Sequence, residues 1–199
     1  TATVYDGETA ITEPKTYSVK QYCDFVLANE ANYDEELVTL CSSLADYGKI
    51  VSDYFSSETT VSGEVGLKAE DLAAYKATKS GTLPTAVKNF ALRLESGTDL
   101  RIYVTSVNGM TAKVGENALA SGKDGYGEYF EIANISASKL CTAFAITVSD
   151  GTNTATLTVS AYSYAYAALK EFENDGEDKK LALVAEAVYN YGEAAKAYF

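Results

Sequence analysis

Two stretches near opposite ends of the chain carry the same pattern of apolar residues, and this repetition constrains the architecture more than any other feature of the sequence. In each stretch, apolar residues recur at spacings of 3, 4, 3, 4 and 3, which is the spacing of one face of an α-helix. The first set is Leu37, Leu40, Leu44, Tyr47, Val51 and Tyr54, and the second is Leu181, Val184, Val188, Tyr191, Ala195 and Tyr198. Two matched amphipathic helices are therefore predicted to bracket the rest of the chain.

A glycine follows the middle tyrosine of each set, at Gly48 and Gly192. A glycine inside a helix costs about 1 kcal/mol relative to alanine. Two glycines at equivalent positions favour a close approach between the terminal helices, although each could instead mark a kink or a tolerated defect. We expect the two terminal helices to touch.

The remaining periodicity separates a central strand region from helices on both sides. Helices are predicted from about residue 16 to 28, over 34–55, 68–78 and 162–172, and from 178 to 199. From Val87 to Val159 the apolar period is closer to two, and the strands predicted there are 87–95, 100–107, 110–114, 126–133, 143–149 and 154–160. Residues 115–125 are glycine-rich and are predicted to form a loop longer than a hairpin requires.

These elements define an α+β fold in one module, residues 1–199. An antiparallel β-meander or small sandwich occupies about 87–160. Helical hairpins at 16–55 and 161–199 flank it, with the short helix 68–78 between the first hairpin and the sheet. We expect the two hairpins to pack together beside the sheet as an approximate four-helix layer.

Charge and composition exclude several classes of function. The formal net charge is −12, whereas binding to nucleic acid or to an anionic membrane surface requires clustered lysines and arginines. No apolar run is long enough to cross a membrane. The chain has no histidine and no tryptophan, so it lacks the commonest general base, and each pair of acids is explained by a helix N-terminus or a loop. The protein is predicted not to be an enzyme.

The glycine-rich segment holds the candidate binding residues Tyr126, Tyr129 and Asp124. Aromatic rings beside a carboxylate on a loop of a β-scaffold suit a sugar ligand, through ring stacking and hydrogen bonds to hydroxyl groups. The alternative is a hairpin whose tyrosines lie on a half-buried sheet face. Because tyrosine is so common in this chain, with 16 copies, we expect at least one of the two rings to lie in the core.

No cofactor or metal is predicted. The acidic segment 171–176 does not match an EF-hand, because the position of the closing carboxylate is Ala182. The segment is predicted to be a solvated helix–helix turn, and a nonstandard calcium site there is the alternative. Cys23, Cys41 and Cys141 are interpreted as small buried hydrophobic residues. Cys23 and Cys41 lie on adjacent predicted helices and could approach each other, and the sequence does not decide whether they form a disulfide.

Two helix ends, Ala45-Asp-Tyr-Gly-Lys-Ile-Val-Ser-Asp-Tyr-Phe55 and Tyr189-Asn-Tyr-Gly-Glu-Ala-Ala-Lys-Ala-Tyr-Phe199, carry a resemblance to a known kind of module. Together with Leu92-Arg-Leu-Glu-Ser-Gly-Thr-Asp-Leu-Arg-Ile-Tyr103 and Glu131-Ile-Ala-Asn-Ile-Ser-Ala137, they resemble a recurrent module of large secreted surface proteins of Gram-positive gut bacteria. The resemblance implies an extracellular or cell-surface location and a multimodular parent. It assigns no catalytic or binding residues.

The expected function is that of a non-catalytic extracellular module for adhesion or assembly, with a protein or a glycan as its ligand. The alternatives are a structural spacer without a ligand of its own and a carbohydrate-binding module. The expected partners are neighbouring modules of the same polypeptide and the ligand. Nucleic acid and membrane insertion are not expected.

Overall fold

The structure is a computed structural model that describes residues 5–6, 9–10, 18–56, 63–94 and 97–199. Its helices are α1 (Val19–Leu27), α2 (Glu35–Phe55), α3 (Ala161–Asp175) and α4 (Lys179–Tyr198). Three short 3-10 helices are η1 (Glu30–Asn32), η2 (Ala69–Tyr75) and η3 (Ala137–Lys139). Residues 16 and 17 of the predicted first helix lie outside the described residues.

Two antiparallel sheets form a sandwich, which confirms the predicted α+β fold. The five-stranded sheet has the order β3-β11-β10-β6-β7, and the four-stranded sheet has the order β4-β5-β9-β8. The strands of the first sheet are β3 (Thr78–Gly81), β6 (Thr111–Val114), β7 (Asn117–Ala118), β10 (Phe144–Ser149) and β11 (Thr154–Val159). Those of the second are β4 (Val87–Leu94), β5 (Thr98–Val104), β8 (Ala120–Asp124) and β9 (Gly127–Ile132). A separate two-stranded ribbon pairs β1 (Tyr5–Asp6) with β2 (Thr9–Ala10).

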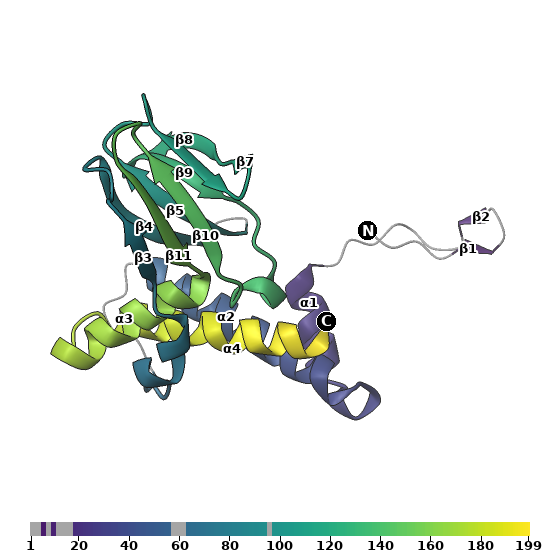
Figure 1. Ribbon diagram of the computed structural model, residues 1–199. Helices are drawn as coiled ribbons and strands as arrows, with labels where there is room; N and C mark the ends of the chain where they lie inside the picture. The colour runs from purple at the N-terminus through teal and green to yellow at the C-terminus, as the bar shows by residue number, and fades with distance from the viewer. Residues whose placement is uncertain (1–4, 7–8, 11–17, 57–62, 95–96) are drawn as a thin grey trace.

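The helices form a layer across one end of the sandwich, with both sheets rising from it (Figure 1). Helix α1 packs on α2, α2 packs on α4, and α4 packs on α3. The middle tyrosines of the two matched sets, Tyr47 and Tyr191, stack with their ring centroids 5.3 Å apart. The prediction that the terminal hairpins pack together is therefore confirmed.

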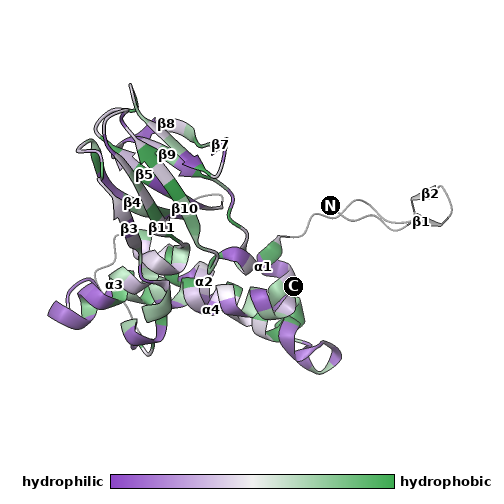
Figure 2. Ribbon diagram, in the orientation of Figure 1, coloured by the Kyte–Doolittle hydropathy of each residue, from purple (hydrophilic) through white to green (hydrophobic). Residues whose placement is uncertain are grey.

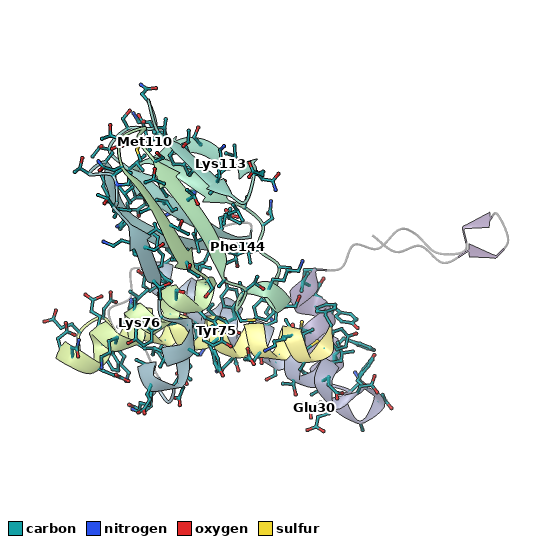
Figure 3. All side chains as sticks on the ribbon, in the orientation of Figure 1. Glu30, Tyr75, Lys76, Met110, Lys113 and Phe144 are labelled. Carbon is teal, nitrogen blue, oxygen red and sulfur yellow. The ribbon has the colours of Figure 1, made fainter. Side chains whose placement is uncertain are left out.

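The main hydrophobic core joins the sandwich to helices α3 and α4. Ile102 of β5 and Ile146 of β10 are fully buried, and they belong to the same apolar cluster as Tyr162 of α3 and Val184 of α4. Figure 2 shows hydrophobic stretches along β5 and β10, inside the sandwich. In Figure 3 Tyr75 lies at the helical end of the molecule, where its ring meets that of Tyr162 edge-on with 5.0 Å between centroids.

The two glycines behave differently. A Cβ atom at Gly192 would collide with the hydroxyl oxygen of Tyr162, so α4 does approach a neighbour closely there, but the neighbour is α3 rather than α2. A Cβ at Gly48 would meet no atom within 4 Å. The prediction of close packing is therefore wrong for Gly48, which is a tolerated defect on an open face of α2.

Three local predictions are corrected. The segment 115–125 is not one loop, because it contains β7 and β8. The predicted helix 68–78 is the 3-10 helix η2, shorter by several residues, and strand β3 begins at Thr78. The helix predicted over 162–172 extends to Asp175 as α3, and Gly176 follows it in the left-handed conformation, with φ of 73°, that commonly ends a helix.

Candidate ligand-binding groove

The three residues predicted from the sequence lie on one hairpin of the four-stranded sheet. Asp124 is the last residue of β8, Tyr126 lies in the turn, and Tyr129 is in β9. The structure therefore brings them together, but it gives each a different environment.

Asp124 holds the hairpin together. Its Oδ2 accepts hydrogen bonds from Nη1 of Arg101 at 2.8 Å and from the hydroxyl of Tyr103 at 2.6 Å. Its Oδ1 accepts from the backbone N–H groups of Tyr126 at 2.8 Å and Gly127 at 3.2 Å. Burial alone would raise the pKa of Asp124, but these four donors together lower it. Both carboxylate oxygens therefore already have protein partners.

The ring of Tyr129 is enclosed by its own sheet. The guanidinium carbon of Arg101 lies 4.0 Å from the ring centroid, which is a cation–π contact. On β8, Gly122 leaves room for the ring, because a Cβ atom there would lie 2.6 Å from the hydroxyl oxygen of Tyr129. Tyr129 is half-buried rather than part of the core, so the expectation that at least one of the two rings would be in the core is wrong.

The ring of Tyr126 is open to solvent. Tyr126 is 73% exposed, more than the exposed Tyr22 and Tyr198. The ring centroid of Tyr103 lies 6.4 Å from that of Tyr126 in an edge-on arrangement, and the guanidinium carbon of Arg93 lies 5.2 Å from the Tyr126 centroid. Tyr126 therefore keeps the accessible ring that a binding residue requires.

Tyr126 is also one of the residues that line a groove of about 580 Å³ between the four-stranded sheet and the helices. One wall is β4. The opposite wall is an apolar face of α4, formed by Leu181, Val184 and Val188. Tyr54 at the end of α2 and Tyr164 of α3 also line the groove.

The charged side chains that line the groove are basic, in contrast to the acidic chain as a whole. Among its described lining residues, the charged side chains are Lys88 and Arg93, and none is a carboxylate. The whole chain carries −12. Lys88 is exposed and has no ion pair within the described part of the chain. A locally cationic, mostly apolar groove in an acidic protein favours a ligand that carries a negative charge.

Sequence reasoning found Tyr126 but missed the groove. Leu181, Val184 and Val188 belong to the matched apolar stripe, which predicts burial without saying that part of the stripe lines a groove. The sequence did contain a signal for the β4 wall. Asn89, Ala91 and Arg93 are alternate residues of one predicted strand, so they share a face, and their residue types indicate that this face points outward.

Other kinds of site are not formed by the described residues. Within them, no group of three or more histidine, cysteine, aspartate or glutamate residues could hold a metal ion. Cys23, Cys41 and Cys141 are all free thiols. Cys23 and Cys41 are buried, whereas Cys141 is partly exposed. No helix in the described ranges is long and apolar enough to cross a membrane.

No family model, curated protein or solved structure matches this chain in comparisons with known proteins.

Proposed function

We propose that the protein is a non-catalytic binding module for adhesion or assembly, and that the groove beside β4 is its ligand site. The observation that carries this proposal is the combination of an exposed aromatic ring, an apolar wall and two cations in one groove of an acidic chain. Mostly apolar concave sites with a few placed polar groups are where ligands bind. The common core of the sandwich and helices supports the groove from both sides.

The extracellular and multimodular setting is part of the same proposal. It is supported by the resemblance of the helix ends at 45–55 and 189–199 to modules of secreted surface proteins of Gram-positive gut bacteria. Antibodies against the protein should label intact cells of the organism that produces it. Labelling only after lysis would contradict this setting.

The binding role is tested by nuclear magnetic resonance with a mixed library as the probe. The library contains acidic peptides of about eight residues and neutral, uronic and sulfated oligosaccharides. We expect at least one compound to shift backbone amide signals of β4, α4 and the β8–β9 turn. Tyr126→Ala should weaken that binding, because it removes the exposed ring.

Tyr22→Ala is the matched control, since Tyr22 is 50% exposed on α1 and does not line the groove. It should bind as the parent does. If no compound shifts the groove signals, the structural spacer is the better account. The oligosaccharides should also be recovered intact after long incubation, because turnover of any of them would contradict the non-catalytic role.

A further inference from the structure

We infer that the groove captures an extended peptide segment with an acidic side chain, by adding it as a strand to the free edge of β4. This inference rests on the proposed function, because it takes the groove as the ligand site. It goes further by naming the class of ligand and the way in which it is held.

The strand order leaves one edge of β4 open. β4 is the first strand of the four-stranded sheet, and β5 is its only strand partner among the described residues. The N–H of Thr105, just after β5, donates to the C=O of Ala86 at 2.8 Å. Because the backbone groups of successive strand residues point to alternate sides, the odd-numbered residues of β5 direct their N–H and C=O groups toward β4. The register then directs the backbone groups of Asn89, Ala91 and Arg93 toward β5.

The intervening residues Phe90, Leu92 and Leu94 therefore direct their backbone N–H and C=O groups away from β5. Strand edges with unpaired backbone groups are templates for a further strand. Peptide ligands use such edges, with backbone hydrogen bonds for affinity and side-chain pockets for specificity.

The groove runs along this open edge. Its lining includes Ala91, Leu92, Arg93 and Leu94, which are consecutive residues of β4. Successive side chains of a strand point to opposite faces. Residues of both faces can line one groove when that groove follows the strand edge.

The other wall offers apolar contacts to alternate side chains of an added strand. Leu181 of α4 and Tyr164 of α3 are half-buried and line this wall, and the buried side chains of Val184 and Val188 lie beneath it on the same face of α4. An added strand would place every second side chain toward this wall. The remaining side chains would lie near Arg93 and the exposed ring of Tyr126.

Charge selects an acidic segment over a neutral one. Lys88 lies at the start of β4 without an ion pair among the described residues. Its ammonium group reaches the β8–β9 turn, because Nζ lies 3.6 Å from where a Cβ at Gly127 would be. A carboxylate of the ligand near this end of the groove would gain a charge-assisted hydrogen bond.

The same lining argues against a neutral sugar. The described lining offers the hydroxyl groups of a sugar four tyrosine hydroxyls, the cations of Lys88 and Arg93 and one side-chain amide, that of Asn89, but no carboxylate to accept from them. The backbone edge of β4 suits a peptide better, because each peptide residue has an N–H donor and a C=O acceptor that can pair with the free backbone groups of a strand edge.

The edge of the other sheet provides an internal control. β3 is an edge strand of four residues, all of them exposed, and it does not line the groove. Lys79 of β3 is exposed like Lys88 of β4. The two lysines therefore differ mainly in whether a groove runs beside their strand.

The test begins with selection from a phage-displayed library of random peptides of about 12 residues. Peptides enriched on the protein should share an acidic residue and alternating apolar residues. A synthetic copy of one such peptide is then measured by calorimetry. Lys88→Gln should weaken its binding about three- to tenfold, while Lys79→Gln should leave it unchanged.

N-methylation of the synthetic peptide tests strand addition directly. A methyl group on a nitrogen that faces β4 removes a backbone hydrogen bond, and it should weaken binding about tenfold or more. Methylation at the alternate residues should be tolerated, because those N–H groups face away from β4. Affinity should therefore alternate along the peptide with a period of two.

Several outcomes would overturn the inference. These are failure to enrich any peptide, equal tolerance of N-methylation at all positions, and equal effects of the two lysine substitutions. A protein that forms a dimer through β4, seen as amide signals of β4 that change with protein concentration, would also overturn it. Groove signals that respond only to oligosaccharides would refute strand addition and leave the proposed binding site standing.

Discussion

At the scale of single residues, the two glycines of the matched helices provide a controlled comparison. Gly192→Ala should lower the free energy of unfolding by about 1–3 kcal/mol, because the added methyl group collides with the Tyr162 hydroxyl. That hydroxyl is held by hydrogen bonds to the C=O of Tyr189 and to Glu193, both 3.1 Å, so it cannot move without losing them. Chemical denaturation measures the change.

Gly48→Ala makes the same chemical change on an open helix face. It should raise the free energy of unfolding by up to about 1 kcal/mol through helix propensity alone. Shifts of the same sign in both variants would contradict the packing described for Gly192.

The cysteines should differ in reactivity toward a thiol reagent. Burial and a hydrogen bond with Cys23 raise the pKa of the Cys41 thiol to about 11, and its residue is 2% exposed. Little thiolate is then present at pH 8, and the thiolate is the reactive form. Cys141 is partly exposed and should react first with Ellman's reagent. Rapid modification of Cys41 in the folded protein would contradict the burial of this thiol pair.

At the scale of elements, the β8–β9 hairpin should respond to acid through Asp124. The pKa of Asp124 is lowered from its ordinary value of 3.8. A carboxyl group with a lowered folded-state pKa stabilises the protein above its unfolded-state pKa, and this stabilisation is lost as the pH falls through the folded-state pKa. Asp124→Asn should therefore destabilise the protein at pH 7, and the difference from the parent should shrink below about pH 4.

Glu116→Gln is a suitable control, because Glu116 is an exposed residue of the turn between β6 and β7. Urea unfolding at several pH values provides the comparison. A difference for Asp124→Asn that stays constant from pH 7 to pH 3 would argue against the role of this carboxylate.

Helix α1 should open before the other helices. It packs on α2 through a small apolar cluster of its own, centred on Cys23, Val26 and Cys41. Small clusters outside the main core open with a lower free energy than the core itself. In native-state hydrogen exchange, amides of α1 should exchange faster than those of α4. Equal protection of α1 and α4 would show that this hairpin is coupled to the core.

Elements with a buried face were predictable from the sequence, and elements without one were not. The matched stripes predicted α2 and α4 because their apolar faces are half-buried in α2 and largely buried in α4. β3 is exposed at every position, and β8 carries Gly122 where the sheet must accommodate the ring of Tyr129, so neither shows an alternation of apolar side chains. The candidate site was found in part for the same reason. Tyr126 was recognised as a candidate from its residue type, whereas the groove wall consists of apolar residues that the sequence does not distinguish from core residues.

At the scale of the whole molecule, the sandwich and helices α2 to α4 should unfold together. Tyr162 of α3 is fully buried, and its backbone N–H donates to the C=O of Leu140, just after η3. The Ser163 hydroxyl donates to the C=O of Tyr75 at 2.5 Å, which ties α3 to η2. The Glu186 carboxylate of α4 accepts from the N–H groups of Gly66 and Leu67 at 3.2 and 3.0 Å.

The contacts of Ser163 and Glu186 join segments more than 80 residues apart in the chain, so neither layer keeps its core when the other unfolds. Thermal unfolding followed by far-ultraviolet circular dichroism, which reports mainly the helices, should coincide with unfolding followed by the near-ultraviolet signal of the tyrosines. Tyr103 of β5 and Tyr129 of β9 place that second signal partly in the sandwich. Two separate midpoints would show that the helical layer is an independent domain. The groove would then lie between two units that can move apart, and strand addition at β4 would lose the fixed opposite wall that α4 provides.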